Sequence, residues 1–187
     1  RCVKFGLRKE DNVIQFIKDI ETNIGAIEVA IYNIGGNIKF GITDTTSQKY
    51  YKTWEMATYG AFLTGREVAK YMIKRKSGTI IFTGATSSLS GGDGYSAFSG
   101  AKHAKRSLAQ SMARELGPEG IHVAHFIIDG AIDTQFIKEM FPDTYALKDK
   151  DGILKPDMIA ENYWNIHSQH RSAWTHELDL RPYMEKF

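Results

Sequence analysis

Apolar residues recur at every third or fourth position near the start of the chain, directly after Asp11. These positions are Val13, Ile14, Phe16, Ile17, Ile20 and Ile24. The spacing places them on one face of a helix that ends at Gly25. The next apolar run, residues 27–34, is short, rich in isoleucine and valine, and followed by Gly35 and Gly36. It predicts a strand buried on both faces, with a glycine-rich turn after it.

Helix and strand patterns then alternate to the end of the chain. Segment 47–76 contains few helix breakers and collects basic residues at its C-terminal end, which predicts a long helix. A buried strand at 79–82 leads through a polar, glycine-rich loop at 83–94 into a helix over 96–116. The remaining predicted elements are a strand at 121–128, a short helix at 135–141, a helix from Pro156 to about residue 168, and a strand at 174–180.

This alternation predicts an α/β fold with a doubly wound, mainly parallel, Rossmann-type sheet. Helices are expected on both faces of the sheet, and ligands beyond the C-terminal ends of its strands. The length of 187 residues and the hydrophobic share of 42% fit one domain over residues 1–187.

Composition narrows the classes of partner. The chain has 24 Lys and Arg against 22 Asp and Glu, so its formal charge of +2 predicts neither nucleic acid nor a membrane surface as partner. No apolar run approaches the roughly 18 residues that span a bilayer, and no charged and apolar leader opens the sequence. Cys2 is the only cysteine, which excludes an internal disulfide and favours a cytoplasmic location.

Three segments that follow successive predicted strands carry recognisable motifs. They are Tyr32-Asn33-Ile34-Gly35, then Phe98-Ser99-Gly100-Ala101-Lys102 with Ala113-Arg114-Glu115-Leu116-Gly117 at the end of the same helix, and Asp129-Gly130-Ala131-Ile132-Asp133-Thr134. Together they resemble the short-chain dehydrogenase/reductase family over nearly the whole chain. The resemblance implies NAD or NADP as cofactor and a small carbonyl or alcohol substrate. It implies that the cofactor is bound by Asn33, Gly35, Lys102, Gly130, Ile132 and Thr134.

The phosphate-binding part of that family is not found in this sequence. No G-x-G-x-x-G turn occurs, and in the family that turn presents backbone N–H groups to the pyrophosphate. The first strand, the turn, the following helix and the second strand would precede Arg1. We therefore expect a chain without its N-terminal βαβ portion, with roughly fifty residues of a longer protein preceding it. The choice between NAD and NADP is set in that portion.

The family's reaction centre is altered at three positions. Phe98 stands where the family has its catalytic Tyr, Ala85 where it has Ser, and Ala57 where a helix carries Asn. A phenyl ring has no proton to donate, and general acid catalysis typically contributes about a hundredfold to ten-thousandfold. Lys102, four residues after Phe98, is the retained catalytic candidate, with a solvated surface lysine as the alternative. Tyr95 is the candidate replacement acid, with an aromatic wall of the pocket as its alternative.

Two functions follow from these substitutions. One is a short-chain dehydrogenase/reductase-like oxidoreductase with an atypical active site. The other is a catalytically idle member of the family that acts as a nucleotide-binding or scaffold module. The family resemblance also implies a homodimer or homotetramer, paired through segments 47–76 and 96–116, where Ala97, Ala101 and Ala104 permit close approach.

Other residue clusters give weaker signals. His167 and His170 share a helix but have no third ligand nearby, so no metal is expected. His122 and His125 lie three apart on a strand, hence on opposite faces. The basic series Lys102, His103, Lys105 and Arg106 lacks interleaved aromatic residues and is expected to form a mixed solvated face.

Overall fold

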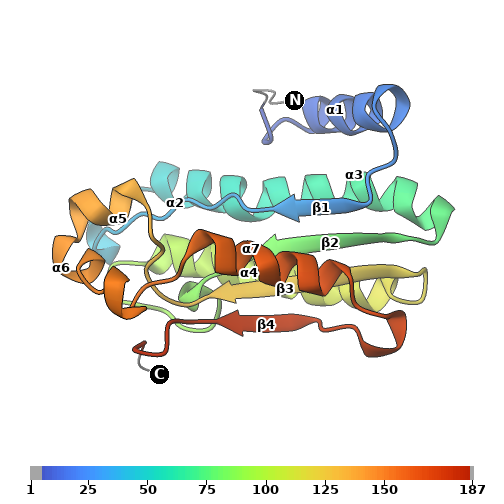
Figure 1. The fold of residues 1–187 in the computed structure, drawn as a ribbon. Helices are drawn as coiled ribbons and strands as arrows, with labels where there is room; N and C mark the ends of the chain where they lie inside the picture. Colours follow the sequence, from blue (N-terminus) through green and yellow to red (C-terminus); the bar gives the residue numbers. More distant parts are fainter. Residues whose placement is uncertain (1–5, 186–187) are drawn as a thin grey trace.

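A computed structural model describes residues 6–185, and Cys2 lies outside them. Its centre is a four-stranded parallel sheet in the order β1-β2-β3-β4 (Figure 1). The strands are β1 (Val29–Tyr32), β2 (Gly78–Thr83), β3 (Ile121–Ile128) and β4 (Glu177–Leu180). Each strand is joined to the next by a helical crossover, as parallel pairing requires. The predicted α/β fold with a parallel sheet is confirmed.

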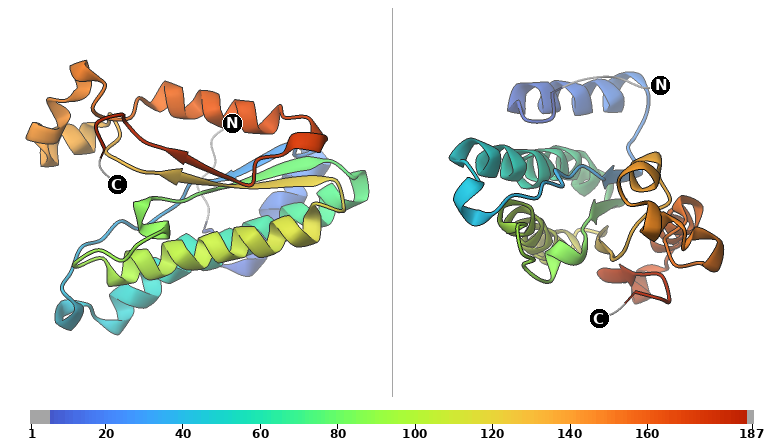
Figure 2. Two further views of the ribbon diagram at one scale, coloured as in Figure 1. Left: turned by 90° about the horizontal axis from the view of Figure 1, so that it is seen from below. Right: turned by 90° about the vertical axis from the view of Figure 1, so that its left-hand side faces the viewer.

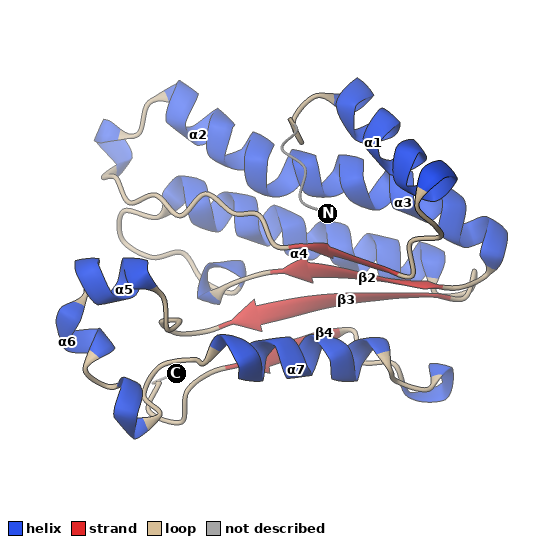
Figure 3. Cartoon of the chain, turned by 45° about the horizontal axis from the view of Figure 1, so that its top comes forward, coloured by secondary structure: helices blue, strands red, loops and turns tan. Residues whose placement is uncertain are grey.

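Helices cover both faces of this sheet (Figures 2 and 3). On one face lie α2, α3 and α4, with α1 packed against α3, and on the other lies α7. The short helices α5 and α6 lie near the C-terminal ends of the strands. The bounds are α1 (Glu10–Asn23), α2 (Ser47–Trp54), α3 (Gly60–Arg75), α4 (Ser96–Leu116), α5 (Gln135–Met140), α6 (Pro142–Tyr145) and α7 (Pro156–His167), with short 3-10 turns at Ile42–Asp44, Thr86–Ser88, Lys148–Lys150 and Arg171–Ala173. No helix among residues 6–185 is both long and apolar enough to cross a bilayer.

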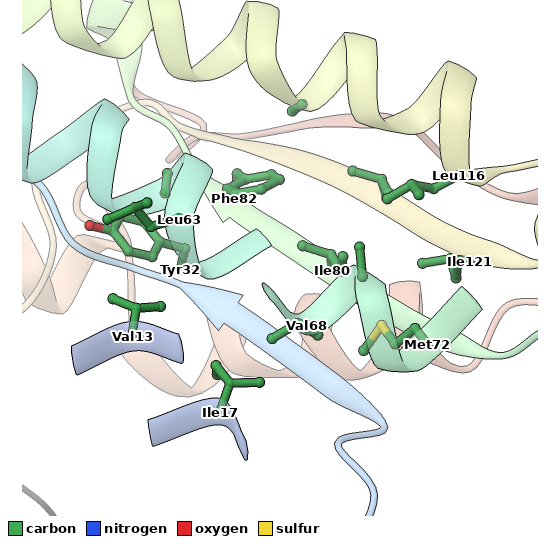
Figure 4. Close-up of a cluster of buried hydrophobic side chains, with 14 residues drawn as sticks. Val13, Ile17, Tyr32, Leu63, Val68, Met72, Ile80, Phe82, Leu116 and Ile121 are labelled. Carbon is green, nitrogen blue, oxygen red and sulfur yellow. The ribbon is translucent and has the colours of Figure 1, made fainter. Parts of the chain in front are cut away.

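The core is divided by the alternation of side chains along the strands. Ile80 and Phe82 of β2 face α3 and α4, whereas Ile81 faces α7. Figure 4 shows the larger cluster. In it, Val13 and Ile17 of α1 pack with apolar side chains of α3 and of the sheet. Both central strands therefore bury apolar side chains on two faces, as their continuous apolar runs predict.

The outer strand β1 differs from its prediction. Its run was expected to be buried on both faces, but Ile31 is 49% exposed, while Tyr32 is 4% exposed. The reason is positional: β1 pairs only with β2 among the described residues, and α7 lies over the far part of the sheet. One face of β1 therefore opens toward a cavity rather than a helix.

The long helix predicted over 47–76 is interrupted by a π-helical turn at Glu55–Tyr59. Such turns leave a backbone group outside the regular i→i+4 ladder. Here the Tyr32 hydroxyl donates to the Met56 carbonyl within this turn at 2.5 Å. Ala57 is fully buried within this turn.

Two of the small residues expected at a subunit interface are used within the chain itself. Ala97 and Ala101 are 3% and 1% exposed, and the Thr58 hydroxyl donates to the Ala101 carbonyl at 2.7 Å. Both residues are therefore buried within the chain, and the pairing of subunits through segments 47–76 and 96–116 stays a prediction. Ala104 is half-buried and borders a hollow beside Tyr50.

Candidate functional site

One cavity of about 1190 Å³ opens where the C-terminal ends of β1, β2 and β3 meet. Because the three strands are parallel, the turns that follow them lie at one edge of the sheet, and α4 and α7 complete the walls. The cavity collects nearly all the positions singled out from the sequence: Asn33, Gly35, Ala85, Tyr95, Phe98, Lys102, Gly130, Ile132 and Thr134. Ala57 alone is not among the lining residues.

Lys102 lies one helical turn after Phe98 and is 6% exposed, so the alternative of a solvated surface lysine is wrong. Its Nζ donates to the carbonyl of Thr83 at 3.0 Å and to that of Gly84 at 3.3 Å. A methyl group at Gly35 would lie 3.3 Å from this Nζ. The glycine thus lets the turn after β1 approach the amine closely.

Two aromatic rings stand beside this amine. Phe98 is 8% exposed, and the centroid of its ring lies 5.4 Å from Lys102 Nζ. Tyr95 is half-buried, and its ring centroid lies 6.4 Å from that of Phe98. Lys39 Nζ lies 5.5 Å from the centroid of the Tyr95 ring. Tyr95 is therefore part of the same wall as Phe98 and Lys102.

The hydroxyl groups around Ala85 have separate partners. The buried Ser88 hydroxyl accepts a hydrogen bond from the Ala85 N–H at 3.1 Å, and it does not line the cavity. The Thr86 hydroxyl donates to the Asp129 carboxylate. Ser87 also lines the cavity. The loop after β2 thus keeps hydroxyls at the cavity even though Ala85 itself has none.

Asp129, which stands where the family motif has proline, ties three segments together. Besides Thr86, it contacts Arg181 at 3.1 Å, and the two side chains are 9% and 16% exposed. The following Gly130 has a φ of 139°, a region that few side chains tolerate. A methyl group there would also lie 2.8 Å from the ring of Pro182. The turn after β3 is therefore fixed by the segment after β4.

The last predicted contacts, Ile132 and Thr134, lie in the segment that leads into α5. Asp133 N–H and Leu154 N–H form the hydrogen bonds of a short parallel bridge, and neither bond uses the N–H of Ile132. The Thr134 hydroxyl donates to the Ile132 carbonyl at 3.2 Å and accepts from the Ile137 N–H at 3.3 Å. Thr134 therefore caps α5 as well as facing the cavity.

Sequence reasoning missed Lys105 and Tyr163. Lys105 was assigned to a solvated basic face, but it is fully buried, and its Nζ donates to the carbonyls of Ile34 at 2.8 Å and Thr83 at 3.1 Å. Tyr163 of α7 lines the cavity and shares a hydrogen bond of 2.6 Å with the Thr83 hydroxyl. Nothing in the local sequence marks either residue, because their partners lie on other strands.

The two histidines of β3 have different surroundings, as their spacing predicts. His125 is fully buried, and its Nδ1 donates to Glu177 at 3.0 Å, while Arg106 contacts the same carboxylate with two nitrogens. Burial lowers the pKa of His125 to about 4 despite that carboxylate. His122 instead stacks on Trp174 with ring centroids 4.8 Å apart.

The histidines of the last helical region also have separate partners. His167 shares a hydrogen bond of 2.9 Å with the Thr79 hydroxyl, and His170 bonds Ser172. Among residues 6–185 no cluster of three or more His, Cys, Asp or Glu side chains is placed to hold a metal ion.

The parallel sheet and the cavity at its strand ends define an α/β protein of the nucleotide-binding type. The profile of the short chain dehydrogenase family matches residues 1–144, and the chain belongs to that family.

Individual relatives agree with this assignment. The chain is 41% identical to a short-chain dehydrogenase from Rhodopseudomonas palustris, and the two superpose with a TM-score of 0.79 over 96% of this chain and 73% of that one. It is also 29% identical to zerumbone synthase from Zingiber zerumbet. The 142 matched residues are 75% of this chain and 53% of the synthase. ElxO with NADP bound is 18% identical and has a TM-score of 0.87 over 97% of this chain and 77% of ElxO, a likeness of fold. The chain spans about half the length of the curated relatives it matches.

Proposed function

We propose that this chain forms the nicotinamide end of an oxidoreductase that transfers hydride between NAD or NADP and a small carbonyl or alcohol substrate. The observation that carries the proposal is that the turns after three parallel strands and the buried Lys102 share one cavity. The ElxO structures, with NADP bound and, for a tyrosine-to-phenylalanine variant, with NADPH bound, lend support by analogy. In this proposal residues 1–187 belong to a single domain.

The residues of the cavity fit the nicotinamide end of such a cofactor. Gly35 leaves space beside the Lys102 amine, where a side chain would crowd it. Lys102 would hold the ribose hydroxyls, and the Thr134 hydroxyl with the Ile132 backbone would hold the carboxamide. Asn33 and Gly130 would form the walls on either side. The bound cofactor would supply or accept hydride at the substrate carbon.

The proton chemistry must come from other groups than in most of the family. Phe98 has no exchangeable proton and Ala85 no hydroxyl. The nearby groups on the same wall that carry protons are Lys102 and Tyr95. We assign the catalytic role to these two side chains, with Phe98 as an apolar wall that limits water in the site.

A second function is supported by the same substitutions. Phe98, Ala85 and Ala57 together remove the usual acid, its partner hydroxyl and the helix amide, which favours an idle protein that binds a nucleotide or serves as a scaffold. Lys102 and Thr134 favour the enzyme.

Cofactor titration separates these proposals. NADH and NADPH are titrated into the full-length protein, and carbonyl and alcohol substrates are then surveyed beside a Phe98→Tyr, Ala85→Ser double variant. Turnover by the unaltered protein supports the oxidoreductase. Cofactor binding with turnover only in the double variant supports the idle protein, and absence of binding by both would refute the proposed cofactor site.

We further propose a homodimer or homotetramer and a cytoplasmic location. The exposed Tyr50 and Tyr51 on α2, beside Ala104 of α4, support the first, and the single cysteine supports the second. Sedimentation of the full-length protein tests the assembly.

A further inference from the structure

Lys102, which lines the cavity, has the amine of the fully buried Lys105 beside its own. Both Nζ atoms donate to the Thr83 carbonyl, at 3.0 and 3.1 Å. Lys102 also donates to Gly84, and Lys105 to Ile34. Because both amines donate to one carbonyl oxygen, they lie close enough to interact, and that interaction raises the pKa of Lys102 and lowers that of Lys105. Two lysines therefore meet at the point where the turns after β1 and β2 converge.

Hydrogen counting shows how these contacts can be satisfied. A neutral amine has two N–H groups and one lone pair, whereas an ammonium has three N–H groups and no lone pair. Lys105 uses two N–H groups, on Ile34 and Thr83, so a neutral Lys105 keeps a lone pair available to accept from the neighbouring Lys102. Two ammonium groups would have no such bond between them.

The charge of the pair agrees with this count. Among residues 6–185 no carboxylate forms an ion pair with either lysine. Burial lowers the pKa of Lys102 to about 8, and the bond to Lys105 opposes that shift. Burial, followed by the charge of Lys102, lowers the pKa of Lys105 to about 6. These pKa values favour a protonated Lys102 and a neutral Lys105 at pH 7.

The other titratable groups around the pair carry no net charge near neutral pH. Burial raises the pKa of Tyr32 on β1, whose ring centroid lies 5.2 Å from Lys105 Nζ, and that of Tyr163 on α7. Burial keeps His125 on β3 neutral. Beyond it, Arg106 and Glu177 form an ion pair with each other.

We propose that Lys102 is the proton donor of the reaction, and that Lys105 is the positioning residue that keeps this proton on Lys102. The proposal rests on the oxidoreductase function proposed above. A bound dihydronicotinamide would supply hydride to the carbonyl carbon, and the electron pair of the carbonyl π bond would move to oxygen. That oxygen would replace the Gly84 carbonyl, the longer of the two backbone contacts at 3.3 Å, and would take that proton from the Lys102 ammonium, leaving an alcohol and a neutral amine. Solvent in the open cavity returns the proton to Lys102, and the reverse reaction uses the neutral amine as base.

The first test measures the Lys102 titration directly. Lysine side-chain NMR signals of the full-length protein are followed from pH 5 to 11 in the unaltered protein and in Lys105→Met, Lys105→Gln and Lys18→Met. Lys105→Met keeps the length but removes the acceptor, so Lys102 should lose its proton about one pH unit lower. Lys105→Gln keeps an acceptor oxygen and should restore part of the shift. Lys18→Met, on the exposed face of α1, should change nothing. An unchanged Lys102 titration in Lys105→Met overturns the role of Lys105.

The second test follows carbonyl reduction by the same proteins against pH. Reduction needs protonated Lys102, so its alkaline limb should move to lower pH in Lys105→Met by the same interval as the NMR titration. A limb that stays in place, or that is lost in Tyr95→Phe instead, overturns Lys102 as donor while leaving the oxidoreductase function intact. If none of the proteins turns over substrate at any pH, the proposed function and the donor role of Lys102 are both refuted. If the Lys102 titration still shifts in Lys105→Met, the interaction between the two amines stands.

Discussion

Replacement of Gly84 by alanine should disrupt the fold and the candidate site together. Gly84 directly follows β2, and its N–H donates to the Phe126 carbonyl at 2.5 Å while its own carbonyl accepts from Lys102. An added methyl group would lie 2.3 Å from His125 Nε2 and 2.7 Å from the Phe126 carbonyl oxygen. The obstacle is steric, because the φ of Gly84 is not in the left-handed region.

The surroundings of Gly84 cannot move aside cheaply. The His125 ring is fully buried and tied to Glu177 through Nδ1, and the Phe126 carbonyl is part of the central strand. Unstrained contacts of this type need about 3.5 Å, so the overlap exceeds an ångström. Overpacking of this kind costs about 1–3 kcal/mol and occasionally more. We expect a value near 3 kcal/mol, equivalent to a fall in Tm of roughly 6–12 °C for a domain of this size.

Urea and thermal unfolding, followed by circular dichroism, measure this loss. Gly91→Ala is the matched control, since it lies on the same loop and a methyl group there has nothing within 4 Å. The double variant Gly84→Ala, His125→Ala should recover part of the loss because the obstructing ring is gone. If Gly84→Ala and Gly91→Ala unfold at the same urea concentration, the close packing of His125 on this turn is refuted.

Three further changes test other contacts. Asp129→Asn removes the charge paired with Arg181 at 3.1 Å and should lower the free energy of unfolding by about 1.5–3 kcal/mol; an unchanged urea midpoint would contradict a stabilising ion pair. Because burial lowers the pKa of His125 to about 4, its contribution to stability is complete above the unfolded pKa and is lost as the pH falls from about 6.5 toward 4, at up to about 1.4 kcal/mol per pH unit. The gap in unfolding free energy between the protein and its His125→Gln variant should therefore change between pH 7 and 5, and a constant gap argues against it. Tyr32→Phe removes the hydroxyl that donates to the Met56 carbonyl and should cost about 0.5–1.5 kcal/mol, seen as faster hydrogen exchange at 55–59; equal exchange would rule this out.

The strands and helices were largely predictable because each depends on local periodicity. The apolar run at 121–128 is fully buried along β3, and the face that includes Val13 and Ile17 packs in the core. Two errors have a non-local origin. Ile31 is exposed because β1 lies at the outer position of the described sheet. The helix predicted over 47–76 becomes π-helical at Glu55–Tyr59, where Tyr32 contacts it.

The candidate site was predictable as a set of turns, but not in its hydrogen bonds. Motif spacing and parallel topology were enough to expect Gly35, Lys102 and Gly130 at one edge. Nothing in the sequence distinguishes Lys105, which is buried, from the exposed His103 two residues before it. Likewise, the substitution at Asp129 gains its meaning only from Arg181, fifty-two residues later along the chain.

The sequence by itself therefore determined the order of strands and helices, the glycine turns between them, and the absence of a hydroxyl on the side chains of Phe98 and Ala85. These depend on residue type and on spacing within one element. The tertiary structure decided the burial of both lysines, the lowered pKa of each, and the anchoring of Asp129. The physical reason is that desolvation and hydrogen bonding are set by groups from several strands and helices, which come together only when the sheet is formed.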